Sequence, residues 1–184
     1  MHITNSYRAQ VFLLLATIAI GIYTLISISS SPESFGSATN SDGLIVKQLT
    51  NEPFSGIVTD TIANKIITYE VKNGLKHGDL TISYLNGKKA ITGKMLDNKN
   101  NGKWYYYYPS GKLESEGFFK NDIVVDNWTW YYQNGNKMEE GCFSNGKRDG
   151  IWKLYNEDGD LKKSIIYNKG NVISSFDSGS SKSS

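Results

Sequence analysis

The chain has 184 residues and a formal net charge of +2, from 20 Lys and Arg against 18 Asp and Glu. This length suits one domain and a leader. The basic residues form no run, whereas nucleic-acid-binding proteins concentrate Lys and Arg on one face, so we expect no nucleic-acid partner. Cys142 is the only cysteine, which excludes an intrachain disulfide and a cysteine zinc site.

Residues 11–28 contain no charged side chain. As a helix they would span about 27 Å, enough to cross the hydrocarbon core of a bilayer. Arg8 precedes this segment, and Glu33 and Asp42 follow it. Positive residues favour the cytoplasmic side, so the sequence predicts a cytoplasmic segment 1–10 and a single-pass inner-membrane anchor, with the rest of the chain extracytoplasmic.

A cleaved signal peptide is the alternative reading of the same segment, because Ser27 and Ser29 offer small residues at alternate positions. It would give a secreted or periplasmic protein. Residues 29–43 are small, polar and aperiodic, which predicts a flexible spacer. Residues 177–184 have a similar composition, which predicts a disordered tail.

A repeat of 24 residues dominates the remaining sequence. Its turn glycines are Gly87, Gly111, Gly135 and Gly159. Seven residues before them stand Leu80, Trp104, Trp128 and Trp152, and six residues after them stand Gly93, Gly117, Gly141 and Ile165. A weaker copy, two residues short, begins at Gly56. The repeats are therefore placed near 56–77, 78–101, 102–125, 126–149 and 150–172.

Each repeat holds two short runs rich in Trp, Tyr, Phe, Ile and Leu, bounded by Gly, Asn or Asp. Such runs are typical of β-strands, and Asn-Gly and Asp-Gly are typical of tight hairpin turns. We therefore predict an all-β domain over residues 44–176. It should be an elongated, single-layer antiparallel β-meander of about five hairpins, a twisted ribbon roughly 45 Å long if it has about ten strands.

Alternation along the predicted strands assigns side chains to two faces. One face collects the repeated Trp positions together with Tyr106, Tyr108, Trp130 and Tyr132. Tyr107, Tyr131 and Tyr155 recur on the opposite face. Because a single-layer sheet has no second layer, stacked aromatic side chains on neighbouring strands should supply much of its stability.

The repeated pattern resembles the MORN repeat, and most closely the bacterial MORN-variant form of the YwqK-type antitoxin family. The residues that match it most completely are Glu140, Gly141, Phe143, Asn145, Gly146, Asp149, Gly150, Trp152, Tyr155 and Gly159. The resemblance extends over about 56–172. It implies an elongated β-meander scaffold used for protein contact, with phospholipid binding proposed for some members. The antitoxin label implies that a toxin is neutralised by binding.

No constellation of residues predicts catalysis. His77 lies in a predicted turn, and no second histidine is available in the repeats for a metal site or a Ser-His-Asp triad. The stretch Asn156–Asp160 resembles a calcium loop, but the repeat places a hairpin turn there. We therefore expect no enzyme, no catalytic residue, no metal and no cofactor.

Positions kept in the repeats predict structural roles: Trp104, Trp128, Trp152, Gly87, Gly111, Gly135, Gly159, Gly117 and Gly141. Departures are where an individual function could lie. Tyr105 and Phe118 are bulkier than their counterparts, and Ile123, Val124 and Val125 replace Lys147-Arg148-Asp149 on what the repeat predicts to be an outer turn. Exposed apolar residues often mark contacts, so this turn is either a loop packed on its own sheet or a partner-docking edge.

The sequence thus favours a membrane-tethered, non-enzymatic scaffold that binds another protein through an aromatic sheet face, in the manner of an antitoxin or immunity protein. The candidate partner-binding residues are Tyr105, Tyr106, Tyr108, Phe118, Ile123, Val124, Val125, Trp130 and Tyr132. Carbohydrate or envelope-polymer binding and lipid contact are the alternatives. A further alternative is that the sheet coils and covers its own aromatic face. Open strands at both sheet edges also favour a homodimer by edge pairing.

Overall fold

The computed structural model describes residues 37–178. The predicted cytoplasmic segment 1–10 and membrane segment 11–28 lie outside this range, as does most of the predicted tail. Across the described residues the chain forms strands and turns, with no helix that could cross a membrane.

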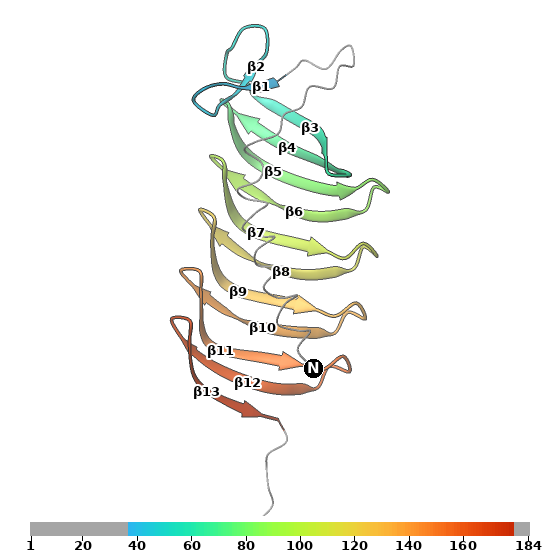
Figure 1. Ribbon diagram of the computed structural model, residues 1–184, viewed down its shortest axis with the longest axis vertical. Coiled ribbons are helices and arrows are strands. Elements are labelled where there is room, and N and C mark those ends of the chain that lie inside the picture. The colour runs from blue at the N-terminus through green and yellow to red at the C-terminus, as the bar shows by residue number, and fades with distance from the viewer. Residues whose placement is uncertain (1–36, 179–184) are drawn as a thin grey trace, which may run out of the picture.

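Eleven strands form one antiparallel sheet in which every strand lies beside its neighbours in sequence (Figure 1). These strands are β3 (Gly56–Ile62), β4 (Lys65–Lys72), β5 (Leu75–Tyr84), β6 (Lys89–Leu96), β7 (Lys99–Tyr107), β8 (Leu113–Lys120), β9 (Ile123–Tyr131), β10 (Lys137–Ser144), β11 (Lys147–Tyr155), β12 (Leu161–Asn168) and β13 (Asn171–Asp177). The predicted β-meander is confirmed. The estimate of ten strands is one short, because β13 follows the fifth repeat.

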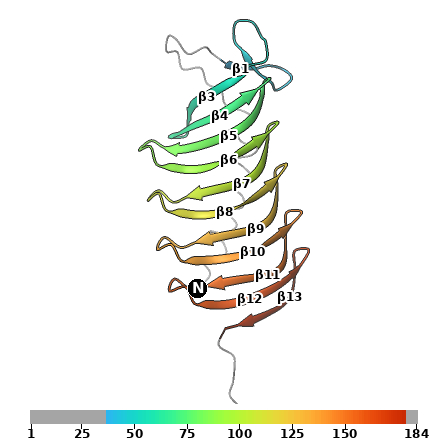
Figure 2. The ribbon, with the colours of Figure 1, turned by 180° about the vertical axis from the view of Figure 1, so that it is seen from behind.

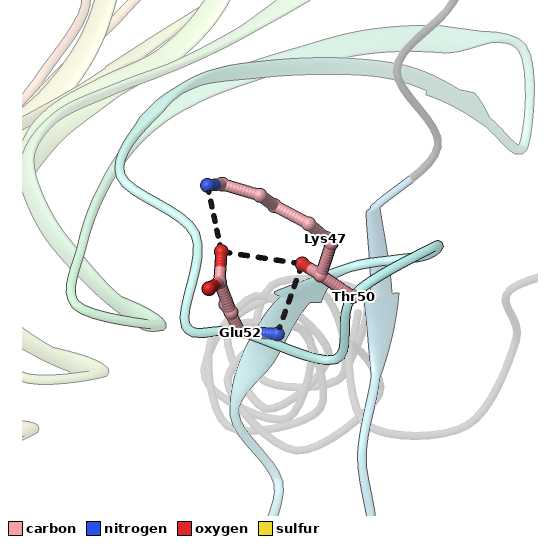
Figure 3. Close-up of polar contacts among 3 residues, drawn as sticks. All are labelled: Lys47, Thr50 and Glu52. Atoms are coloured by element: carbon pink, nitrogen blue, oxygen red, sulfur yellow. Dashed lines mark hydrogen bonds and ion pairs between the residues drawn. The ribbon is translucent and has the colours of Figure 1, made fainter.

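A small two-stranded sheet precedes the meander and consists of β1 (Ser37–Thr39) and β2 (Ile45–Lys47). The structure therefore differs from the predicted flexible spacer 29–43, whose last residues form β1 and a turn. The loop after β2 is held by Glu52, which accepts hydrogen bonds from Lys47 at 3.1 Å and Thr50 at 3.3 Å (Figure 3). Val46 lies buried in this segment and bridges to Pro53.

Two kinds of turn alternate along the meander. At one side the turns have two residues with positive φ, as at Asn145 (49°) and Gly146 (76°), which is the geometry of a type I′ turn. At the other side four loops have three residues and end in a glycine, as where the Tyr132 N–H donates to the Asn136 carbonyl and the Gly135 N–H to the Tyr132 carbonyl. The four predicted turn glycines all occupy this loop position with φ between 80° and 100°. The β3–β4 turn is the exception, with two residues of positive φ, Ala63 and Asn64.

The strands are bent, so that the sheet has a curved cross-section (Figures 1 and 2). Residues on its inner face form the hydrophobic core, in which Trp128 is 1% and Trp152 0% exposed. Strand register confirms the predicted alternation, because Ile91, Tyr106, Ser115 and Trp130 lie in one row across β6 to β9. This core corresponds to the alternative in which the sheet coils and covers its own aromatic face.

The core is a chain of aromatic rings that crosses the repeats. Trp and Phe alternate along it in edge-to-face contacts, with ring centroids 5.7, 5.4, 6.3 and 4.9 Å apart from Trp104 through Phe119, Trp128 and Phe143 to Trp152. This is the preferred arrangement for aromatic pairs, and each contributes about 0.5–1.5 kcal/mol beyond its area burial. The chain of rings replaces the second layer that a single sheet lacks.

The buried Trp rings lie directly over glycine backbone. A Cβ atom added to Gly117 would come within about 2 Å of the Trp128 ring, and Gly141 stands in the same relation to Trp152. Each indole also donates a hydrogen bond from Nε1 to a backbone carbonyl. For Trp128 the acceptor is the Phe118 carbonyl, at 3.1 Å. The predicted structural role of Trp128, Trp152, Gly117 and Gly141 thus has a specific cause, which is the close approach of the indole to the neighbouring strand.

Lys76 is a partly buried cation in the first repeat, 56–77. Its Nζ lies 5.0 Å from the centroid of the Tyr69 ring, and burial lowers the pKa of Lys76 from 10.5 to about 8. Between those values the unfolded chain binds more protons than the folded chain, so the free energy of unfolding should rise with pH. Below pH 8 the buried charge acts against folding.

We therefore expect Lys76→Met to be more stable than the wild type at pH 7, and to lose most of the rise in stability between pH 8 and 10. Denaturant unfolding at several pH values measures this. Tyrosine ionisation begins in the same pH range, but it is common to both proteins and cancels when their profiles are compared. Parallel pH profiles for the two proteins would show that Lys76 is not the group responsible.

A candidate protein-binding face

The nine predicted partner-binding residues divide between the two faces of the sheet. Strand register places Tyr106, Val124 and Trp130 on the inner face and Tyr105, Phe118, Ile123 and Val125 on the outer face. Tyr108 and Tyr132 lie where strands enter the three-residue loops. The predicted set therefore does not form one surface.

The inner residues belong to the core. Trp130 is 8% exposed and stacks on Trp128 with ring centroids 5.6 Å apart. Tyr106 packs against the same cluster, and burial raises its pKa. These rings offer little surface to a partner in this conformation.

Tyr108 and Tyr132 connect successive repeats. The Tyr108 hydroxyl donates to the carbonyl of Tyr131 at 2.7 Å, and the Tyr132 hydroxyl donates to that of Tyr155 at 2.9 Å. Tyr84 makes the same contact with Tyr107 at 3.3 Å. Recurrence at a 24-residue spacing gives both residues a structural role, which the same spacing in the sequence could have indicated.

The predicted outer turn at residues 123–125 is wrong. The turn consists of Asn121 and Asp122, and the apolar residues after it begin β9. Asp122 adopts a φ of 67° in place of a glycine, and its carboxylate accepts a hydrogen bond from the Asn100 N–H at 2.7 Å. Asp tolerates positive φ better than most residues, so the turn keeps its two-residue form without glycine.

Alternation along β9 then separates the three apolar residues. Val124 lies opposite Phe119 and packs on the core, whereas Val125 lies opposite Phe118 on the outer face. Ile123, opposite Lys120, is 47% exposed. Only two of the three could therefore contribute to an outer contact.

Two of the outer residues, Tyr105 and Phe118, lie beside one lysine. We call Lys103, Tyr105, Phe118, Ile123 and Val125 the outer patch. The Lys103 Nζ lies 5.1 Å from the centroid of the Tyr105 ring and 5.8 Å from that of Phe118. The cation therefore lies near two aromatic rings whose bulk is peculiar to this repeat.

Glu116 fixes this lysine in place. Its Oε2 lies 2.8 Å from the Lys103 Nζ, and its Oε1 accepts a hydrogen bond from the Tyr131 hydroxyl at 2.9 Å. Partial burial acts to raise the pKa of Glu116, but these hydrogen bonds outweigh it and lower the pKa. Burial and the bond to Glu116 together raise the pKa of Tyr131 to about 12. The group therefore keeps its charges across the physiological pH range.

The two rings beside Lys103 are peculiar to this repeat, whereas the Glu116–Tyr131 bond recurs as Glu140–Tyr155 at 2.6 Å. The position of Phe118 is taken by Lys94, Cys142 and Ile166, and that of Tyr105 by Thr81, Thr129 and Lys153. Lys103, Glu116 and Tyr131 were not among the predicted partner-binding residues. Strand alternation could have indicated Lys103, since it lies two residues before Tyr105 on the same strand face.

The described residues offer little for metal chemistry. Among residues 37–178 no group of three His, Cys, Asp or Glu side chains is arranged to hold a metal ion. His77 lies in β5, not in the predicted turn, and pairs with Asp97 of the β6–β7 turn at 3.1 Å. Asn156 and Asp160 close a three-residue loop, as the repeat predicts, with the Asn156 side chain accepting the Asp160 N–H at 2.8 Å.

An antiparallel meander of 24-residue units, with its variable residues on one outer surface, defines a β-repeat scaffold. Residues 100–121, 127–145 and 148–169 match the family model described as MORN repeat variant. The chain thus contains MORN-variant repeats between residues 100 and 169. The search of curated proteins found no match to the chain. The sheet continues through β3 to β6, beyond the matched residues.

Proposed function

We propose that this chain is a non-enzymatic repeat scaffold that binds another protein through the outer patch. The observation that supports the proposal is the convergence of departures from the repeat. Tyr105, Phe118, Ile123 and Val125 come from three strands, each differs from its counterparts, and all four face outward together. Residues that serve only the scaffold would not need to differ in this way.

The chemistry of the outer patch suits a protein partner. Tyrosine and other large rings contribute much of the binding energy at protein interfaces, in desolvated centres surrounded by polar groups. Here Tyr105 and Phe118 stand beside the Lys103–Glu116 ion pair, which holds their surroundings in one arrangement. A preordered surface loses less conformational entropy when a partner binds.

The predicted membrane segment 11–28 would tether this scaffold with its sheet outside the cytoplasm. In that setting an immunity-like role follows naturally, in which the outer patch masks a functional surface of a secreted toxin. Carbohydrate stacking on the predicted aromatic face has less support, because Trp130 and Tyr106 lie in the core.

The test replaces three outer residues with the types found elsewhere in the repeats: Phe118→Lys as at Lys94, Ile123→Lys as at Lys147, and Val125→Asp as at Asp149. We expect this triple variant to fold, since the chain already accepts these residues at equivalent positions. Partner captured from membranes by crosslinking, and quantified by mass spectrometry, should fall at least tenfold.

Cys142→Lys is the matched control, because Cys142 occupies the position of Phe118 one repeat later and should leave capture unchanged. The circular dichroism spectrum of each variant must equal that of the wild type. Undiminished capture by a folded triple variant would contradict the proposal.

A further inference from the structure

The two edge strands of the sheet, β3 and β13, differ in their protection against pairing with another chain. On β3, Asp60 lies opposite Ile67, a buried core residue, and so projects from the inner face. An inward-pointing charge on an edge strand discourages a further strand from adding to it. The β3 edge therefore has one of the usual protective devices.

On β13 the one charged residue is the last, Asp177, which lies in the inner row opposite Lys163 and pairs with it at 3.6 Å. From Asn171 to Phe176 the strand has no charged residue and no proline. Val172, Ile173 and Phe176 are 60%, 61% and 59% exposed. An exposed apolar edge strand is a template for pairing with another strand.

The register of β13 explains why its apolar residues are exposed. Phe176 follows Trp152 by 24 residues, which would place its ring in the core. Between the pairs Glu140↔Lys153 and Cys142↔Asp149, β11 has two residues more than β10, and these two form a bulge. Between β12 and β13 only one residue is bulged, so Phe176 lies opposite Ser164 in the outer row. A one-residue slip moves a side chain to the other face.

The core ends at the same place. Ile165 stands where Gly141 admits the Trp152 ring in the preceding repeat, so no further indole could lie over it. The rings instead finish at Tyr167, whose centroid is 6.0 Å from that of Trp152. The hydrophobic core thus ends at β12 and β13, whereas the outer edge of β13 pairs with no other described strand.

The geometry points to a second copy of this chain as the occupant of that edge, paired antiparallel through β13. The Ser178 N–H donates to the Lys162 carbonyl, so by alternation Ser175 and Asp177 direct their backbone groups to the open side. Such a two-fold contact closes a dimer, with one continuous sheet across both copies.

Charge and edge chemistry favour this occupant. Lys169 precedes β13 and Asp177 ends it, so antiparallel pairing brings opposite charges near each other at both ends of the contact. Within one copy Asp177 also lies 3.6 Å from Lys163, so it is not a lone buried charge. Head-to-tail pairing of β13 with β3 would cover Asp60 and is disfavoured.

A crosslinking experiment on the full chain in its membrane tests this. In a Cys142→Ser background, Ser175→Cys on β13 should give a covalent dimer with a short bismaleimide. Thr59→Cys on the β3 edge is the matched control and should give at least tenfold less. Equal dimer from the two positions would overturn the proposal in favour of head-to-tail assembly, and no dimer from Ser175→Cys would overturn it in favour of an unpaired edge.

Light scattering of the full chain in detergent gives a second readout. Ile173→Lys places a charge on the open edge and should reduce the dimer fraction at least tenfold, with an unchanged circular dichroism spectrum. The outer-patch triple variant should still dimerise, which separates this contact from the proposed partner site. A dimer unaffected by Ile173→Lys would show that the copies associate elsewhere.

Discussion

Trp128→Ala should destabilise the domain by about 3–5 kcal/mol, the usual range for deleting a fully buried tryptophan. Trp128 is 1% exposed and its ring contacts those of Phe119, Phe143, Tyr106 and Trp130. Removing it leaves a cavity at the centre of the ring chain and also deletes the hydrogen bond to the Phe118 carbonyl. A single bent sheet has no second layer that could collapse into the space.

Chemical denaturation of the chain, followed by the fluorescence of the remaining tryptophans, measures this loss. Trp128→Phe is the comparison, since it keeps a ring in the cavity and should destabilise less. A loss below about 1 kcal/mol for Trp128→Ala, which is typical of a surface change, would mean that the rings do not form the core.

Gly117→Ala should destabilise the domain by about 1–3 kcal/mol through overpacking, although it adds only one methyl group. The new Cβ would meet ring atoms of Trp128 at 2.0, 2.1 and 2.3 Å. Those atoms lie in the rigid part of a buried indole, so the ring or the strand must move. Gly117 does not have a positive φ, and the effect is therefore steric.

A double-mutant cycle isolates this cause. In a Trp128→Leu background the added methyl group has more room, so Gly117→Ala should cost clearly less than it does beside the indole. The unfolding free energies of the four proteins give the coupling. Additive effects would indicate that the glycine is needed for a reason other than the approach of the ring.

Most of the fold follows from the repeat. The 24-residue spacing, the alternation within strands and the turn glycines suffice to predict the meander, its faces and its loop positions. Two of the predicted structural positions have a local physical cause in the structure. Gly135 supplies a positive φ at a loop, and Gly141 supplies room for a ring on the next strand.

Features that depend on longer-range geometry could not be predicted. The bend of the strands makes one face an interior, which turned Trp130 from a candidate surface residue into a core residue. The position of a turn within a repeat depends on which two residues take positive φ. At residue 122 an Asp takes this conformation, so the glycine that would mark the turn is absent. The register slip in β13 depends on a single bulged residue and leaves no mark in the spacing.

The candidate site was predicted in part. Departures from the repeat identified Tyr105, Phe118, Ile123 and Val125, which the sheet brings to one surface. Their convergence depends on strand register, and the link through Lys103 and Glu116 depends on side-chain contacts across β7 and β8. Neither the strand register nor these contacts can be inferred from the departing residues one position at a time.

Site-specific photocrosslinking tests the proposed binding role most directly. A photoreactive amino acid is placed at Tyr105 in the outer patch and, separately, at Thr81 and Thr129, its counterparts on the same face of other repeats. After irradiation of intact cells, we expect one protein adduct of defined mass from position 105 and little from positions 81 and 129. Equal labelling at all three positions, or no adduct from position 105, would contradict a partner site at the outer patch.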